Sequence, residues 1–128
     1  MPTIEHLQPC ESVTSGPNHH YFGYYDKFPW DVSGRYLVCL ESTFMDRPQR
    51  PGETAVIGLI DTANGNEWRP LAETRAWNWQ QGTMLHWLDW DPAGRIIYND
   101  VRDGQFVSVT RKVHSDEERV LPRPVYNV

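Results

Sequence analysis

The chain has 128 residues, the length of one ordinary domain, and its 17 acidic residues against 12 Lys and Arg give a formal net charge of −5. This charge disfavours a nucleic-acid partner, since proteins that hold a phosphate backbone carry a basic surface. A hydrophobic fraction of 39% suffices for a packed core, but the apolar runs at 36–40 and 55–60 are too short to cross a membrane.

The first residues and the cysteines exclude two further classes. The opening MPTIEHLQPCESV lacks the basic start and apolar stretch of a secretory signal, so we expect a cytoplasmic protein without a membrane partner. Cys10 and Cys39 are too few for a disulfide framework or, unaided, a zinc site.

Strand signals run along the whole chain, and no segment keeps a 3.6-residue apolar period for three turns. Aromatic and β-branched runs bounded by turn residues predict eight strands, at 21–25, 35–41, 54–61, 67–71, 84–90, 95–100, 105–113 and 118–126. Asp103-Gly104 is a hairpin signal, and Pro70 places the fourth strand at a sheet edge.

An internal repeat groups these strands. Residues 30–38 read WDVSGRYLV and residues 90–98 read WDPAGRIIY, so Trp, Asp, Gly and Arg recur sixty positions apart and apolar residues follow. Four antiparallel strands per repeat are typical of a propeller blade. We therefore predict an all-β fold with a polar leader at 1–16 and two four-stranded propeller blades at 17–76 and 77–128. A β-sandwich of eight strands is the alternative that the length also allows.

A propeller closes with roughly four to eight blades, so two blades would need neighbours. We expect the chain to be an N-terminal piece of a longer protein, with the remaining blades beyond it. A ring-completing oligomer is the less favoured expectation.

The second copy, DPAGRIIY followed by NDVRDGQFVSV, resembles the repeat of TolB-like propellers. The stretches NHHYFGYYDKFPWD and TRAWNWQQGTMLHWL are similar to bacterial propeller proteins distantly related to oligogalacturonate lyases, and the resemblance covers most of residues 17–110. In those lyases His and Gln residues of later blades hold manganese. The resemblance therefore implies a divalent metal only through residues beyond this chain.

Propeller geometry places two kinds of loop on one face: the loop before each innermost strand, and the loop between the second and third strands. In this chain they are 18–20 and 77–82, then 46–50 and 99–103. We expect them to converge on a ligand. The Asp-x-x-Gly turns at 31–34 and 91–94 belong to the opposite face and have a structural role.

The residue types of the converging loops suit a sugar. Aromatic rings contact its C–H face, amides and carboxylates bond hydroxyls, and guanidinium groups pair with the carboxylate of an acidic sugar. The candidate ligand-binding residues are Tyr24, Tyr25, Arg47, Arg50, Trp77, Trp79, Gln80, Gln81, Asn99, Asp100 and Arg102. Structural roles compete: Trp77 and Trp79 as wedges between blades, Arg102 as a hairpin residue, and Arg47 and Arg50 as solvated loop charges.

His19 and His20 are the candidate catalytic residues, because histidine serves as a general base or a metal ligand. Neighbours on a strand point to opposite faces, so the two rarely bind the same ion, and we assign no metal site. Packing or a backbone hydrogen bond is the alternative role.

No nucleophile elbow, phosphate loop, HExxH or dinucleotide fingerprint occurs. Three functions stay open. The first is a propeller segment that binds a carbohydrate or another small polar ligand. The second is part of a carbohydrate-active enzyme, such as a polysaccharide lyase or glycoside hydrolase, and the third is a protein-interaction scaffold.

Overall fold

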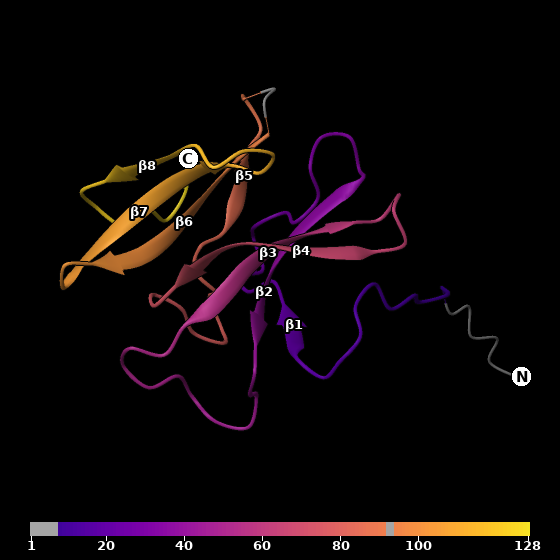
Figure 1. Cartoon of the computed structure of the whole chain (residues 1–128), viewed down its shortest axis with the longest axis horizontal. Coiled ribbons are helices and arrows are strands. Elements are labelled where there is room, and N and C mark those ends of the chain that lie inside the picture. The colour runs from indigo at the N-terminus through magenta and orange to yellow at the C-terminus, as the bar shows by residue number, and fades with distance from the viewer. Residues whose placement is uncertain (1–7, 92–93) are drawn as a thin grey trace, which may run out of the picture.

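The computed structural model describes residues 8–91 and 94–128, and the regular structure of this part is entirely β (Figure 1). The strands are β1 His19–Tyr21, β2 Tyr36–Ser42, β3 Ala55–Asp61, β4 Glu67–Thr74, β5 His86–Leu88, β6 Arg95–Arg102, β7 Gln105–Lys112 and β8 Glu118–Leu121. The prediction of an all-β chain is confirmed. Within the described residues, no helix is long and apolar enough to span a membrane.

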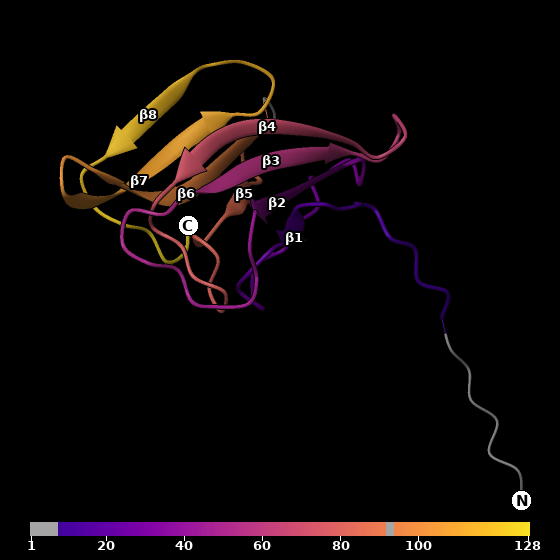
Figure 2. The same ribbon diagram turned by 60° about the horizontal axis from the view of Figure 1, so that its bottom comes forward.

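The strands form two antiparallel sheets, each with four strands in chain order: β1-β2-β3-β4 and β5-β6-β7-β8. Figures 1 and 2 show the sheets side by side, with residues 75–85 leading from β4, at the edge of the first sheet, to β5 of the second. Neither sheet closes on itself. The segment at 8–16 extends along the side of the first sheet that faces away from the second.

The bounds of all eight strands differ from the prediction by one or more residues, and the first and last strands differ most. The first was expected at 21–25 but is β1, because Gly23 has a positive φ of 122° and Lys27 N–H closes a turn onto the Tyr24 carbonyl at 3.2 Å. The last was expected at 118–126, but β8 ends at Leu121, before Pro122. Proline has no N–H for the strand ladder, so the pairing stops there.

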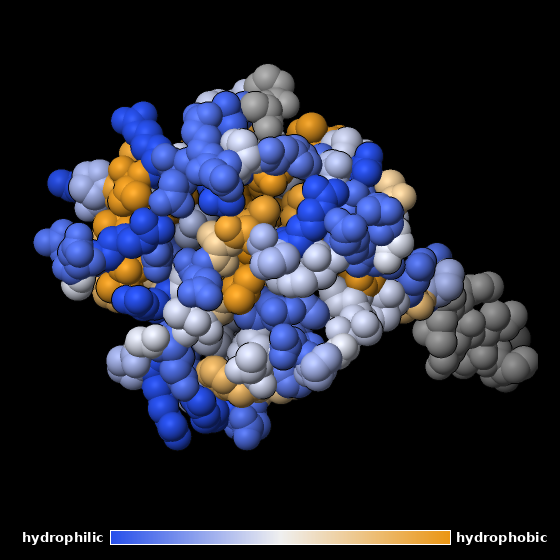
Figure 3. Space-filling view, viewed as in Figure 1, coloured by the Kyte–Doolittle hydropathy of each residue, from blue (hydrophilic) through white to orange (hydrophobic). Residues whose placement is uncertain are grey.

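The core lies between the two sheets. Alternate residues of β2 and β3 meet alternate residues of β6 and β7, and tryptophans from the connection and from β5 fill the space between them. The buried members include Val38, Leu40, Ile57, Leu59, Trp77, Leu85, Trp87, Ile96, Tyr98 and Val109. Apolar side chains also reach the surface over the second sheet (Figure 3). One exposed apolar side chain of this sheet is Phe106 of β7, which is 63% exposed.

A pair of glycines allows the sheets to meet closely. Gly23 follows β1 and Gly82 lies in the connection before β5. A Cβ added at Gly82 would lie 2.7 Å from the Phe22 carbonyl oxygen, and one at Gly23 would lie 2.7 Å from the Gly82 Cα. Both residues also have positive φ, at 59° and 122°. Only glycine satisfies the close approach and the dihedral angles together.

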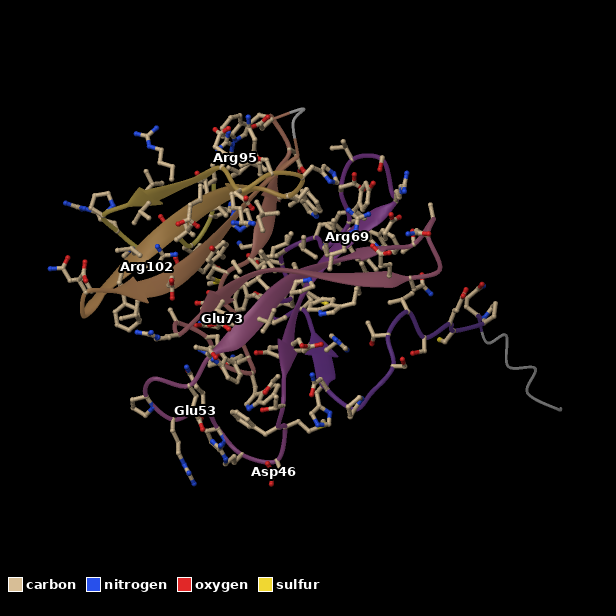
Figure 4. The ribbon with its side chains drawn as sticks, in the orientation of Figure 1. Asp46, Glu53, Arg69, Glu73, Arg95 and Arg102 are labelled. Carbon is tan, nitrogen blue, oxygen red and sulfur yellow. The ribbon has the colours of Figure 1, made fainter. Side chains whose placement is uncertain are left out.

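Each sheet has a turn end and a loop end. The first Asp-x-x-Gly turn lies at the turn end, where the Asp31 carboxylate accepts the Arg35 and Tyr36 N–H groups at 3.1 and 3.0 Å. The second turn, at 91–94, includes residues 92 and 93, which lie outside the described residues. Figure 4 shows Arg69 and Arg95 at the turn ends, away from Asp46 and Glu53 in the loop between β2 and β3.

Candidate functional site

The loop end of the first sheet is organised by one ion pair. In the loop of residues 43–54, the Arg47 guanidinium donates to both Glu53 carboxylate oxygens, at 2.8 and 2.6 Å. Arg50 N–H donates to the same carboxylate at 2.7 Å. These hydrogen bonds, that of Arg47 first, lower the pKa of Glu53 to about 2. The guanidinium of Arg47 therefore stabilises its own loop.

Trp77 and Trp79 attach this loop to the connection between the sheets. The Trp77 indole N–H donates to the Glu53 carbonyl at 3.0 Å, and the Trp79 indole N–H donates to the Arg47 carbonyl at 2.7 Å. The ring of Tyr21 lies 4.7 Å from that of Trp79. Trp77 is only 4% exposed, so its ring belongs to the core, between the sheets. Both indole N–H groups act as anchors here.

A groove of about 740 Å³ opens beside these anchors, between the 43–54 loop, the connection and the ends of β6 and β7. Its lining includes Gln49, Arg75, Trp77, Asn78, Gln81, Met84, Asn99 and Phe106. Three of the four loop regions expected to share a face, 46–50, 77–82 and 99–103, contribute residues to this lining, whereas the fourth, 18–20, does not. Among the candidate ligand-binding residues, Trp77, Gln81 and Asn99 belong to this lining.

Several polar groups of the groove have fixed positions. The Gln49 amide donates to the carbonyls of Glu53 and Arg75 at 2.8 and 2.9 Å. The Asn99 side chain donates to the Val125 carbonyl at 2.8 Å and accepts the Val125 N–H at 2.7 Å. These amides are rigid parts of the wall.

Two longer side chains of the lining remain free. The Arg75 guanidinium and the Gln81 amide make no hydrogen bond or ion pair with any described residue. Arg75 is also the single charged residue among the described residues of the lining. The groove thus combines a free cation and a free amide with an exposed aromatic ring, that of Phe106.

Asp100 and Arg102 lie next to the groove and form an ion pair with each other. Arg102 Nε donates to Asp100 at 2.6 Å, and the other Asp100 oxygen accepts the Arg75 N–H at 3.0 Å. Arg102 also pairs with Glu118 at 3.4 Å. These charges line a neighbouring cavity of about 570 Å³ with Glu73 (Figure 4). The hairpin role of Arg102 fits these contacts.

The two candidate histidines lie away from the groove, on β1. His20 Nε2 bonds to a Glu41 oxygen at 2.8 Å, and its ring lies 4.9 Å from that of Trp68. His20 lines a different cavity, whereas His19 lines neither that cavity nor the groove. The structure therefore separates the candidate catalytic residues from the candidate ligand-binding face.

Tyr24 and Tyr25 belong to a third location. Their rings lie 4.8 Å apart, and the ring of Tyr24 lies 5.9 Å from that of Tyr126 near the other end of the chain. The buried ammonium of Lys27 sits 4.7 Å from the Tyr126 ring and 3.2 Å from an Asp26 carboxylate oxygen. This cluster joins segments a hundred residues apart, and it does not line the groove.

Sequence reasoning missed Arg75, Gln49 and Phe106. Arg75 lies two positions before the predicted loop at 77–82. Gln49 lies inside the predicted loop at 46–50, but the sequence argument names only Arg47 and Arg50 of that loop as candidate ligand-binding residues. Phe106 was assigned only to a strand. Gln80, Arg50 and Trp79 do not line the groove.

No cluster of three or more metal-ligating His, Cys, Asp or Glu side chains occurs among residues 8–91 and 94–128. Comparison with known proteins finds no relative: no family model, no curated protein and no solved structure matches this chain. The resemblance to TolB-like propellers therefore stays a prediction, and the groove is the candidate site that three of the expected loops line.

Proposed function

We propose that the two sheets are neighbouring blades of a β-propeller. Each sheet consists of four consecutive strands in chain order, which is typical of a blade, whereas a Greek-key sandwich exchanges strands between its sheets. The sixty-residue repeat supports the same proposal. A ring of roughly four to eight sheets would be completed by further blades or by further copies of the chain.

We further propose that the groove binds a carbohydrate that carries a carboxylate. The observation that carries this proposal is the free guanidinium of Arg75, the one charged group in the described lining. A guanidinium pairs with a carboxylate through two parallel hydrogen bonds. The Gln81 amide has both donors and an acceptor for hydroxyls, and the exposed Phe106 ring offers a flat apolar face to sugar C–H groups.

The proposal is for binding rather than turnover. The described lining of the groove holds no carboxylate and no histidine, which are the usual acids and bases of sugar chemistry. A lyase or hydrolase function would therefore need residues from elsewhere.

The test is a calorimetric titration of the whole chain with trigalacturonate and with a neutral galactose trisaccharide. We expect trigalacturonate to bind at least about tenfold more tightly, a difference of about 1.4 kcal/mol. Arg75→Gln removes this preference. The matched control is Arg50→Gln, since Arg50 is also exposed but lies outside the lining.

A second pair of variants tests the amide. Gln81→Ala weakens trigalacturonate binding several-fold, whereas Gln80→Ala, at the neighbouring exposed position outside the lining, leaves it unchanged. Equal losses from Arg75→Gln and Arg50→Gln, or no binding of either sugar, would contradict the proposal. Release of shorter oligosaccharides during the titration would favour the enzyme alternative.

A further inference from the structure

A third cavity, of about 470 Å³, lies on the opposite face of the first sheet from the core. We call it the arm cavity, because residues 12–18 form one wall. The other wall is formed by His20 of β1, Glu41 of β2 and Trp68 of β4, with Asn66 before β4. Glu41 belongs to this face because side chains alternate along β2 and the neighbouring Leu40 points into the core.

The sheet fixes the three side chains of that wall. Strand register places His20 directly opposite Glu41, and the two side chains, 9% and 17% exposed, are joined at 2.8 Å. The Trp68 ring occupies the space above Gly58, where an added Cβ would overlap the indole. Each group is thus held by a strand or by a neighbouring side chain, as in a preformed site.

Hydrogen-bonding capacity remains on this wall after these contacts. The second Glu41 oxygen, His20 Nδ1 and the Trp68 indole N–H bond to no described residue. None of them is among the buried polar atoms that lack a partner, so each reaches the cavity or solvent. The amides of Asn18 and Asn66 likewise make no side-chain bond to a described residue.

The charge of the arm cavity is opposite to that of the groove. Glu41 is the acidic residue of the lining, and no Lys or Arg is present among the described lining residues. A carboxylate beside an indole favours a cation, since ammonium N–H groups donate to the carboxylate and the ring attracts positive charge. We propose that the arm cavity binds a small organic amine in its ammonium form, with Glu41 as the acceptor and Trp68 as the aromatic wall.

The test is a titration of the isotopically labelled chain at pH 8, followed by NMR. The probe is n-butylammonium, with n-butanol as its neutral isostere and butyrate as an anion of similar size. We expect only butylammonium to shift the Trp68 indole signal and the amide signals of His20 and Glu41, and to do so saturably. Glu41→Gln weakens this response at least tenfold.

The matched control is Glu73→Gln, because Glu73 is an exposed acid on β4 outside the arm cavity. This variant leaves the titration unchanged. Trp68→Phe keeps an aromatic side chain and weakens binding several-fold, so it also tests the proposal if Glu41→Gln fails to fold. Equal shifts with n-butanol, or an equal loss in Glu73→Gln, would overturn the proposal. We expect Glu41→Gln to bind trigalacturonate as the native chain does, so failure of the arm-cavity proposal can be told apart from failure of the groove proposal.

Discussion

The two sheets share a sequence motif but differ in the ion pairs that it leads to. In the first sheet, the buried carboxylate of Asp61 accepts hydrogen bonds from Arg35 Nε and Nη2, each at 2.8 Å, and one from Arg69 Nη2 at 2.8 Å. In the second, Arg95 turns back to Asp91 at 2.8 Å and reaches Glu117 at 3.3 Å. Glu117 is 57% exposed, whereas Asp61 is 1% exposed.

The residue on the neighbouring strand explains this difference. Asp61 is the register partner of Tyr36, but the partner of Ile96, sixty positions after Tyr36, is Arg111. The second sheet therefore has no acid at the buried position, and the bridging acid lies in the exposed turn before β8. The repeated Asp-x-x-Gly-Arg motif therefore determines the turn, while the residue on the neighbouring strand determines which acid pairs with the arginine.

The largest expected effect comes from breaking the contact that both sheets share. Gly82→Ala places a Cβ 2.7 Å from the Phe22 carbonyl oxygen and forces a positive φ on alanine, so it destabilises the chain by more than about 2 kcal/mol. The control is Gly65→Ala, which has a similar φ of 64° but open space around it. It costs about 1 kcal/mol. Equal unfolding free energies in urea would show that the sheets do not meet there.

The next largest effect distinguishes Asp61 from Glu117, the two acids that each pair with two basic side chains. Asp61→Asn leaves two guanidinium groups without their buried carboxylate, so we expect its melting temperature to fall by at least about 5 °C. Glu117→Gln removes a solvent-exposed partner of Arg95 and Lys112 and leaves the melting temperature nearly unchanged. Similar shifts in thermal melts of both variants would contradict the contrast.

Acid titration sharpens the same contrast. Hydrogen bonds from Arg35, the largest cause, lower the pKa of Asp61 to about 2, below its ordinary value of 3.8. A lowered pKa in the folded state stabilises the fold above the ordinary value, and this stabilisation is lost as the pH falls from about 4 to 2. The difference in melting temperature between the native chain and Asp61→Asn should therefore shrink across that window.

Periodicity and turn residues were sufficient to predict an all-β chain, because strands and turns are local features. All eight expected strands overlap an observed one. The errors have local causes that a pattern of apolar residues does not show. The conformation of Gly23 ends β1 early, and Pro122 ends β8.

The site was predicted less well, because it depends on which polar group each side chain meets. Three of the four expected loops line the groove and the loop at 18–20 does not, while Arg47 and Arg102 are paired with Glu53 and Asp100. Spacing along the chain does not show such pairs, since they depend on side-chain direction. The alternation of β1 placed His20 on the face away from the core, and no loop argument predicted that.

The smallest expected effect compares one tyrosine from each sheet whose hydroxyl is buried. The hydroxyls of Tyr21 and Tyr98 are both buried and, among the described residues, have no hydrogen-bond partner. Tyr21→Phe and Tyr98→Phe should therefore leave stability unchanged or raise it by up to about 1 kcal/mol, because an unpartnered polar group is removed while the ring is kept.

Alkaline titration extends this last comparison. Burial raises the pKa of Tyr98 to about 12 from its ordinary value of 10. The folded state thus keeps its proton longer than the unfolded state does, so this residue costs stability as the pH rises from about 10 to 12. Tyr98→Phe lacks that loss, and its advantage in urea unfolding should grow across the window. A destabilised Tyr98→Phe variant at pH 7 would show that the hydroxyl has a partner in solution, and the two sheets would then differ in their cores as well as in their ion pairs.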